Sequence, residues 1–180
     1  ITDITSITYN GIGLTSLCAL KAATGSIVHL WYLAAPTSGT FDVVVSSIAS
    51  VDLGTQVRTF TGVDQTTVVQ NCTMSAGTAV SFSGTMTSAS GHMVIDGGDF
   101  GGRTLETMGA GQGAGIVIPV SSPTLMSSLK LGAVSVGTSW TLISSNAYVY
   151  LAADILAAPP GGAGSFLFQQ PPREKRGKRR

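Results

Sequence analysis

Two histidines and one pair of neighbouring aspartates are the side chains in this sequence best suited to acid–base or metal chemistry. His29 and His92 are the only histidines, and His29 lies within the most hydrophobic stretch of the chain. A catalytic histidine needs a nucleophile or a carboxylate within hydrogen-bonding reach, and no motif supplies one beside His29. We therefore predict that His29 packs in the core or on a sheet face.

Asp96 and Asp99 flank two glycines and are followed by Gly101 and Gly102. On a flexible loop, two carboxylates would offer oxygen ligands to a hard cation such as Ca²⁺. The composition favours the alternative, which is a solvated turn between strands. Asp96 and Asp99 are therefore weak candidates for a metal site, and we predict no bound metal and no cofactor.

Sequence motifs of common enzymes do not occur in the chain. There is no G-x-S-x-G elbow, no H-E-x-x-H pair and no pair of cysteines at zinc-finger spacing. The glycine-rich residues 109–115 lack the lysine and the following helix of a phosphate loop, so we expect a mobile surface loop there. The sequence therefore predicts a protein that is not an enzyme.

The composition predicts one all-β domain, an antiparallel, jelly-roll-like β-sandwich. Of the 180 residues, 43% are hydrophobic, 11% are charged and 23 are glycine, which suits short strands and tight turns better than helices. Asn10-Gly11 predicts a hairpin turn, and residues 26–33 predict a central strand covered on both faces. The further strands that we expect lie at residues 41–46, 50–52, 56–60, 78–83, 92–95, 115–120, 133–136, 140–143 and 147–151.

Helices, membrane spans and disulfides are each limited by the sequence. Residues 122–129 are the one candidate for a helix, and no apolar run approaches the roughly 20 residues that cross a bilayer, so we expect no contact with a membrane. Cys18 and Cys72 either form a disulfide or remain buried thiols. Because the sequence starts at Ile1 without a leader, we expect a processed product or a fragment.

The end of the chain differs in composition from the rest. We predict a sandwich domain at residues 1–157 and, at residues 158–180, an arm made of a Gly/Pro-rich linker, a short apolar strand and a basic end. Six of the ten basic residues lie in the last eight positions, so a basic arm follows an acidic body. This order predicts an arm that docks elsewhere, for example on a neighbour's open sheet edge. The residues that we expect to bind a partner are Phe166, Leu167, Phe168, Arg173, Lys175, Arg176, Lys178, Arg179 and Arg180.

Three roles are open for the basic end. It could dock on acidic protein surfaces through charge-assisted contacts, remain a solvated tail, or neutralise the phosphates of nucleic acid. Since no aromatic residues interleave the basic run to stack on bases, docking on protein is favoured over nucleic acid.

Three motifs occur in a fixed order along the chain. They are Tyr9-Asn10-Gly11, the segment WYLAAPTSGTFDVVV at residues 31–45, and GVDQTT at residues 62–67. In these motifs the chain resembles a jelly-roll-like β-sandwich domain of phage and environmental virion and surface structural proteins, over roughly residues 1–156. The resemblance implies a sandwich that binds glycans or other subunits, and it carries over no catalytic residue.

These observations predict a non-enzymatic virion structural protein, such as a capsid decoration or fibre-type subunit. Its expected partners are copies of itself and other virion proteins. One alternative is a carbohydrate-binding adhesion module that holds glycans outside the cell or at the cell surface. Another is a single jelly-roll capsid protein whose basic arm binds nucleic acid.

Overall fold

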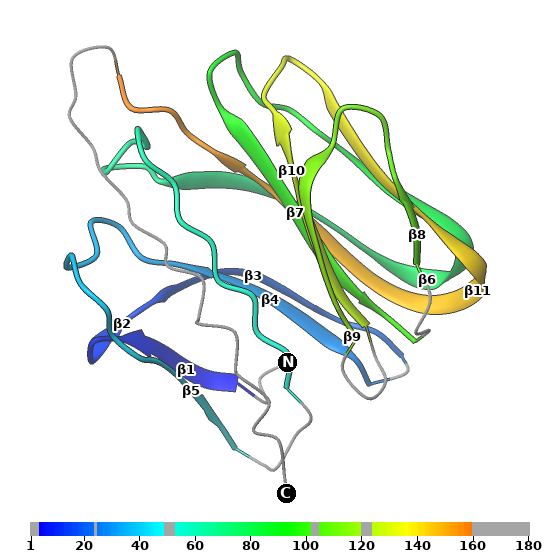
Figure 1. Cartoon of the computed structure of the whole chain (residues 1–180), viewed down its shortest axis with the longest axis horizontal. Helices are drawn as coiled ribbons and strands as arrows, with labels where there is room; N and C mark the ends of the chain where they lie inside the picture. The colour runs from blue at the N-terminus through cyan, green and yellow to red at the C-terminus, as the bar shows by residue number, and fades with distance from the viewer. Residues whose placement is uncertain (1–3, 24, 49–52, 102–104, 120–123, 160–180) are drawn as a thin grey trace, which may run out of the picture.

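Figure 1 shows a computed structural model of the chain, which describes residues 4–23, 25–48, 53–101, 105–119 and 124–159. The described residues form antiparallel strands and loops without any helix. This confirms the prediction of an all-β, sandwich-like fold. The strands are β1 (Ile4–Tyr9), β2 (Ile12–Gly13), β3 (Thr15–Lys21), β4 (Ile27–Tyr32), β5 (Val43–Ser47), β6 (Val69–Met86), β7 (Met93–Phe100), β8 (Leu105–Met108), β9 (Gly113–Pro119), β10 (Thr124–Leu131) and β11 (Val136–Ile155).

The strands form three sheets that stack in layers (Figure 1). The largest sheet has the order β6-β11-β7-β10-β9, and β8 also pairs with β11. A sheet of β3 and β4 and a sheet in the order β2-β1-β5 lie on one side of it. Leu14, between β2 and β3, donates its amide to the carbonyl of Ile7 in β1 at 2.8 Å. The two small sheets therefore form one bent wall opposite the large sheet.

β6 and β11 form a long ribbon that bends back on itself. Their pairing shifts register between Thr141 and Asn146, and Figure 1 shows both strands curving. From opposite halves of β6, the hydroxyl of Thr73 donates to the carbonyl of Thr85 at 3.3 Å. The large sheet is therefore folded over, and it encloses a core between the two halves of the ribbon.

This enclosed core is apolar and tightly packed. Its largest side chains are Trp140 and Tyr150 from β11, Phe100 from β7 and Met126 from β10, each at most 1% exposed. Strand residues alternate between faces, so each strand presents every second side chain to this core. Burial of side chains of this size stabilises the fold by roughly 2–3 kcal/mol each.

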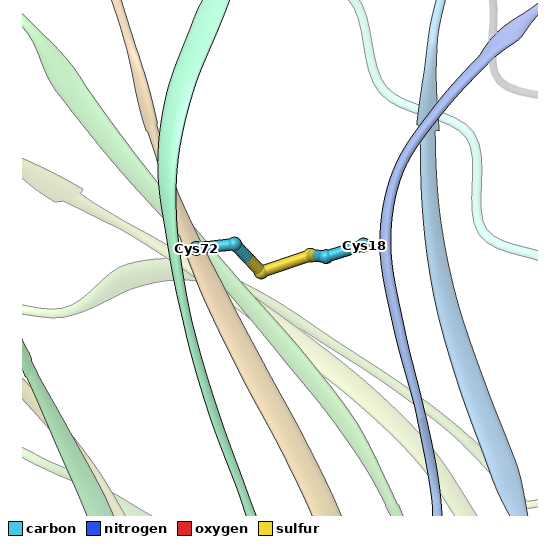
Figure 2. Close-up of a disulfide and its surroundings, with 2 residues drawn as sticks. All are labelled: Cys18 and Cys72. Carbon is cyan, nitrogen blue, oxygen red and sulfur yellow. A yellow bond between two sulfur atoms is a disulfide. The ribbon is translucent and has the colours of Figure 1, made fainter.

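The wall of β3 and β4 packs on the face of β11 that points away from this core. Val28 of β4 is buried against Val149 and Leu151, and the disulfide between Cys18 and Cys72 joins β3 to β6 (Figure 2). The sequence leaves this pairing open, and the structure shows that it forms. Since 54 positions separate the two cysteines, the crosslink stabilises the fold by about 4 kcal/mol through its restriction of the unfolded chain.

Several predicted elements differ from those observed. From residue 124 onward, the candidate helix at residues 122–129 is strand β10, because alternate residues there face the enclosed core. Residues 56–60 and 133–135 lie in loops rather than in strands. The glycine-rich residues 109–115 form a turn that leads into β9, rather than a surface loop throughout. Residues 50–52, and residues 160–180 of the predicted arm, lie outside the described part of the chain.

The described residues contain no helix of the length and apolarity that a membrane span requires.

Candidate functional site between the sheets

Strand β7 separates two very different environments. Asp96 and Asp99 lie three residues apart in this strand, and residues at an odd spacing in a strand point to opposite faces. The predicted loop or solvated turn around Asp96 and Asp99 is therefore wrong, and the two carboxylates do not converge on one cation. Among the described residues, no three His, Cys, Asp or Glu side chains gather in a way that would hold a metal ion.

The carboxylate of Asp96 lies in the enclosed core, where its side chain is held by hydrogen bonds. It is 1% exposed. Ser128 donates its amide at 2.8 Å and its hydroxyl at 2.5 Å to Oδ1. Trp140 donates its indole N–H to Oδ2 at 2.9 Å, and Gln112 donates its amide to the same oxygen at 3.1 Å. Both oxygens of this buried carboxylate are therefore satisfied.

Burial of this network changes the acidity of its members. Burial raises the pKa of Asp96 above the ordinary range of a carboxyl group, while the hydrogen bonds from Ser128, Trp140 and Tyr150 oppose the rise. Burial also raises the pKa of Tyr150, and the nearby charge of Asp96 adds to that effect. The Tyr150 hydroxyl also lies in hydrogen-bond contact with Thr138. The arrangement holds the core together, and each of these residues is at most 2% exposed.

A cavity of about 610 Å³ lies between the large sheet and the wall opposite it. Its sides come from β1, β4 and β5, from residues 53–60, and from the outward faces of β7 and β10. Most of the lining is apolar, and the side chains include Ile7, Leu30, Val45, Phe60, Ile95 and Leu125. The volume falls within the range of roughly 300–1,000 Å³ found for small-molecule sites.

Asp99 lines this cavity from β7. Its side chain is 6% exposed, and its Oδ1 has no hydrogen-bond partner in the described part of the protein. Burial raises the pKa of Asp99 to about 6, and a hydrogen bond from Ser26 opposes the rise. Asp99 therefore carries a negative charge at neutral pH that the described residues leave only partly compensated.

The segment at residues 53–60 closes the cavity on the side of β10. Arg58 donates from Nη2 to the hydroxyl of Ser127 at 2.8 Å and to the carbonyl of Ala114 at 2.6 Å, and Gln56 accepts a hydrogen bond from the same serine. Burial lowers the pKa of Arg58, while the charge of Asp96 opposes this effect. The hydrogen bonds of Arg58 explain why this segment lies against the sheet without joining it.

His29 lies in β4, half-buried, and it also lines the cavity. The indole N–H of Trp31 donates to its Nδ1 at 3.3 Å, and the two rings stack with centroids 6.1 Å apart. This placement on a sheet face agrees with the role predicted for His29 from the sequence.

A third buried carboxylate, which the sequence analysis did not single out, is Asp154, near the end of β11. Its oxygens accept hydrogen bonds from the hydroxyl of Ser88 at 2.5 Å and from the side-chain amide of Gln70 at 3.0 Å. The Nδ1 of His92 lies 2.9 Å from the same carboxylate. In a nucleophilic triad the histidine lies between the serine and the carboxylate, whereas here the carboxylate lies between the other two. The cluster therefore fastens β6, β11 and the loop before β7, and it does not activate Ser88.

The arm residues that were predicted to bind a partner, from Phe166 to Arg180, lie outside the described residues. The described structure therefore says nothing of these predicted partner-binding residues, whereas it divides the two predicted carboxylates, Asp96 and Asp99, between two sites. No protein-family model, curated protein or solved structure matches this chain. The resemblance to virion β-sandwich domains therefore stays a prediction.

Proposed function

We propose that this protein is a structural subunit of a virion-type assembly, in which its sandwich packs against neighbouring protein surfaces. The main support is a described surface that is poor in charge and rich in apolar side chains. Three of the five described aspartates, Asp96, Asp99 and Asp154, are buried. Among the described cations, Arg58 is half-buried and bonded to β10. Few charges are left to oppose close packing with another protein.

Apolar side chains are exposed along strands at the edges of sheets. Val44 in β5 is 53% exposed and Ile48, just after this strand, is 68% exposed. β5 is the last strand in its sheet, and β6, which exposes Met74 and Val80, is the last strand in the large sheet. Open edges with apolar side chains are a liability in a monomer and a docking surface in an assembly.

In this proposal many weak contacts between copies add up to a stable coat, because each new contact in a lattice forms at a high effective concentration. The basic arm at residues 158–180 adds an anchor on acidic neighbours through its sequence composition. The glycan-binding alternative has less support, since Phe41 is the one exposed aromatic side chain among the described residues.

The test compares Val44→Lys with Val134→Lys in the full-length chain. Val134 is 83% exposed in a loop, so it provides a matched change away from the β5 edge. Sedimentation of the purified protein over a range of concentrations should show self-assembly in the wild type. We expect Val44→Lys to raise the concentration needed for assembly by about tenfold or more, and Val134→Lys to leave it unchanged.

A wild-type chain that stays monomeric at millimolar concentration, and that is absent from purified particles, would contradict the proposal. Equal effects of the two lysine substitutions would contradict the role of the β5 edge. Removal of residues 159–180 tests the arm separately, because this change is expected to leave the circular dichroism spectrum of strands intact and to abolish incorporation into particles.

A further inference from the structure

The cavity between the sheets contains a buried carboxylate whose hydrogen bonds are incomplete, which a packed core does not contain. A packed core matches its polar groups internally, as the network around Asp96 does. In the cavity, by contrast, the carboxylate of Asp99 is buried and its Oδ1 has no partner among the described residues. Ser26 donates one hydrogen bond to this carboxylate, but a buried charge that is only partly compensated is still unfavourable in a fold, and it persists most readily where it serves a binding function.

The remaining lining defines what would suit this carboxylate. The cavity walls are apolar along β1, β4 and β5 and along the facing part of β7. Arg58, the one described cation in the lining, already donates to Ser127 and to the Ala114 carbonyl. Thr59 Oγ1 also lines the cavity without a described partner, and as a hydroxyl it can either donate or accept. The requirement specific to Asp99 is therefore a hydrogen-bond donor, preferably positively charged, attached to an apolar body.

We propose that this cavity binds an amphipathic molecule with a primary ammonium group, which places the ammonium on Asp99 and its apolar body along the walls toward Ile95 and Val45. An ammonium group supplies three donors in a compact charge, and Asp99 Oδ1 accepts one of them. The body is held because its transfer from water onto apolar walls contributes roughly 0.8 kcal/mol per buried methylene group. This site goes beyond the assembly role, which uses the outer edges of the sheets.

An anionic ligand fits this site less well. A carboxylate or phosphate beside Asp99 would place two negative charges in an apolar space, where repulsion is poorly screened. Arg58, the described cation of the lining, already uses Nε and Nη2 in hydrogen bonds to Ser127 and to the Ala114 carbonyl. A neutral alcohol of the same length would gain the apolar contacts and one hydrogen bond, without the attraction between charges.

The experiment uses three probes of equal chain length, octylamine, octan-1-ol and octanoate, titrated calorimetrically into the full-length protein at pH 7.5. We expect octylamine to bind about tenfold more tightly than octan-1-ol and octanoate to bind most weakly. Asp99→Asn should remove most of the preference for the amine over the alcohol. Asp42→Asn, which changes an exposed carboxylate outside the cavity, should leave that preference unchanged.

A second variant tests the location of the apolar body. Val45 lines the cavity from β5, so Val45→Phe fills part of the space and leaves the Asp99 side chain in the protein. We expect it to weaken binding of the amine and the alcohol together. Retained binding of both probes in this variant would overturn the assignment to the cavity.

The wild-type protein alone provides a test that does not depend on the folding of variants. Below pH 6 Asp99 gains a proton, since its pKa is about 6, so the ratio of amine to alcohol affinity should fall several-fold between pH 7.5 and pH 5. His29 and Arg58 also line the cavity, and octan-1-ol measured at each pH reports their effect on neutral binding. A constant ratio, or tightest binding by octanoate, would overturn the proposal.

An apolar segment of the chain is the competing occupant, and the same assay detects it. If Phe166 and Phe168 of the arm filled the cavity, the double substitution to serine in the full-length chain would create binding that the wild type lacks. This outcome would overturn the small-molecule proposal in favour of the arm. Binding by the wild type that the serine substitutions leave unchanged supports the proposal.

Discussion

The two faces of β7 carry the same chemical group in opposite situations. On one face, Asp96 is surrounded by donors from Ser128, Gln112 and Trp140 within a closed core. On the other face, Asp99 lines a cavity, and its Oδ1 has no hydrogen-bond partner among the described residues. The Asp96 carboxylate stabilises the core, and the Asp99 carboxylate is available to the ligand that we propose. Burial alone therefore does not distinguish a structural carboxylate from a binding one, whereas the supply of donors around it does.

The largest expected effect separates the two carboxylates directly. Asp96→Ala removes the acceptor for several buried donors, so we expect the free energy of unfolding to fall by about 3–5 kcal/mol. Asp99→Ala removes a carboxylate that lacks full compensation, and the expected loss is below about 1 kcal/mol. Urea unfolding of both variants at pH 7.5 measures the difference. Similar losses in the two variants would mean that the two faces are not distinct.

A smaller effect is expected from the neighbouring glycines, which also face opposite sides of β7. A Cβ at Gly98 would lie 2.5 Å from the carbonyl oxygen of Val149 and 2.8 Å from Cε of Met126, so Gly98→Ala should cost about 1–3 kcal/mol through overpacking. At Gly97 the nearest atom to an added Cβ would be the Met126 carbonyl oxygen at 3.2 Å. Gly97→Ala should therefore lower the free energy of unfolding by less than about 1 kcal/mol. Thermal melting of both variants measures the two losses. A larger loss for Gly97→Ala than for Gly98→Ala would contradict this prediction.

The smallest effect concerns the pH dependence of stability. The pKa of Asp99 is about 6 in the folded protein and about 4 in an unfolded chain. Between these values the folded state holds a proton that the unfolded state releases, so this group lowers stability as pH rises from about 4 to about 6. We therefore expect the free energy of unfolding of Asp99→Asn, relative to that of the wild type, to be about 1–2 kcal/mol higher at pH 7.5 than at pH 4. Equal differences at both pH values, measured in urea, would argue against a raised pKa.

Strands with a regular apolar pattern are predictable from this sequence. The run at residues 26–33 is observed as β4, and the run at residues 41–46 overlaps β5. β7 is harder to predict, because two glycines between two aspartates have low strand propensity. Every second residue of this strand is nevertheless buried, at Val94, Asp96, Gly98 and Phe100. Tertiary packing favours the strand despite its low propensity, because the space at Gly98 admits no side chain.

The candidate site is less predictable than the strands. The sequence singles out Asp99, but it does not indicate that Ser26 and Arg58 reach the same cavity from distant parts of the chain. The same limit applies to Asp154, whose partners Ser88 and Gln70 belong to different ends of a bent strand and its following loop. These contacts depend on how strands far apart in the sequence pair with one another, and no local sequence pattern indicates that pairing.

The folded ribbon of β6 and β11 has a consequence for how the molecule comes apart. Both strands belong to two layers at once, and the disulfide clips the third layer to the same ribbon. Unfolding of one half of the large sheet therefore disturbs the backbone of its other half, and the disulfide links the β3-β4 sheet to the same ribbon. The large sheet and the β3-β4 sheet should therefore unfold together, in a single thermal transition.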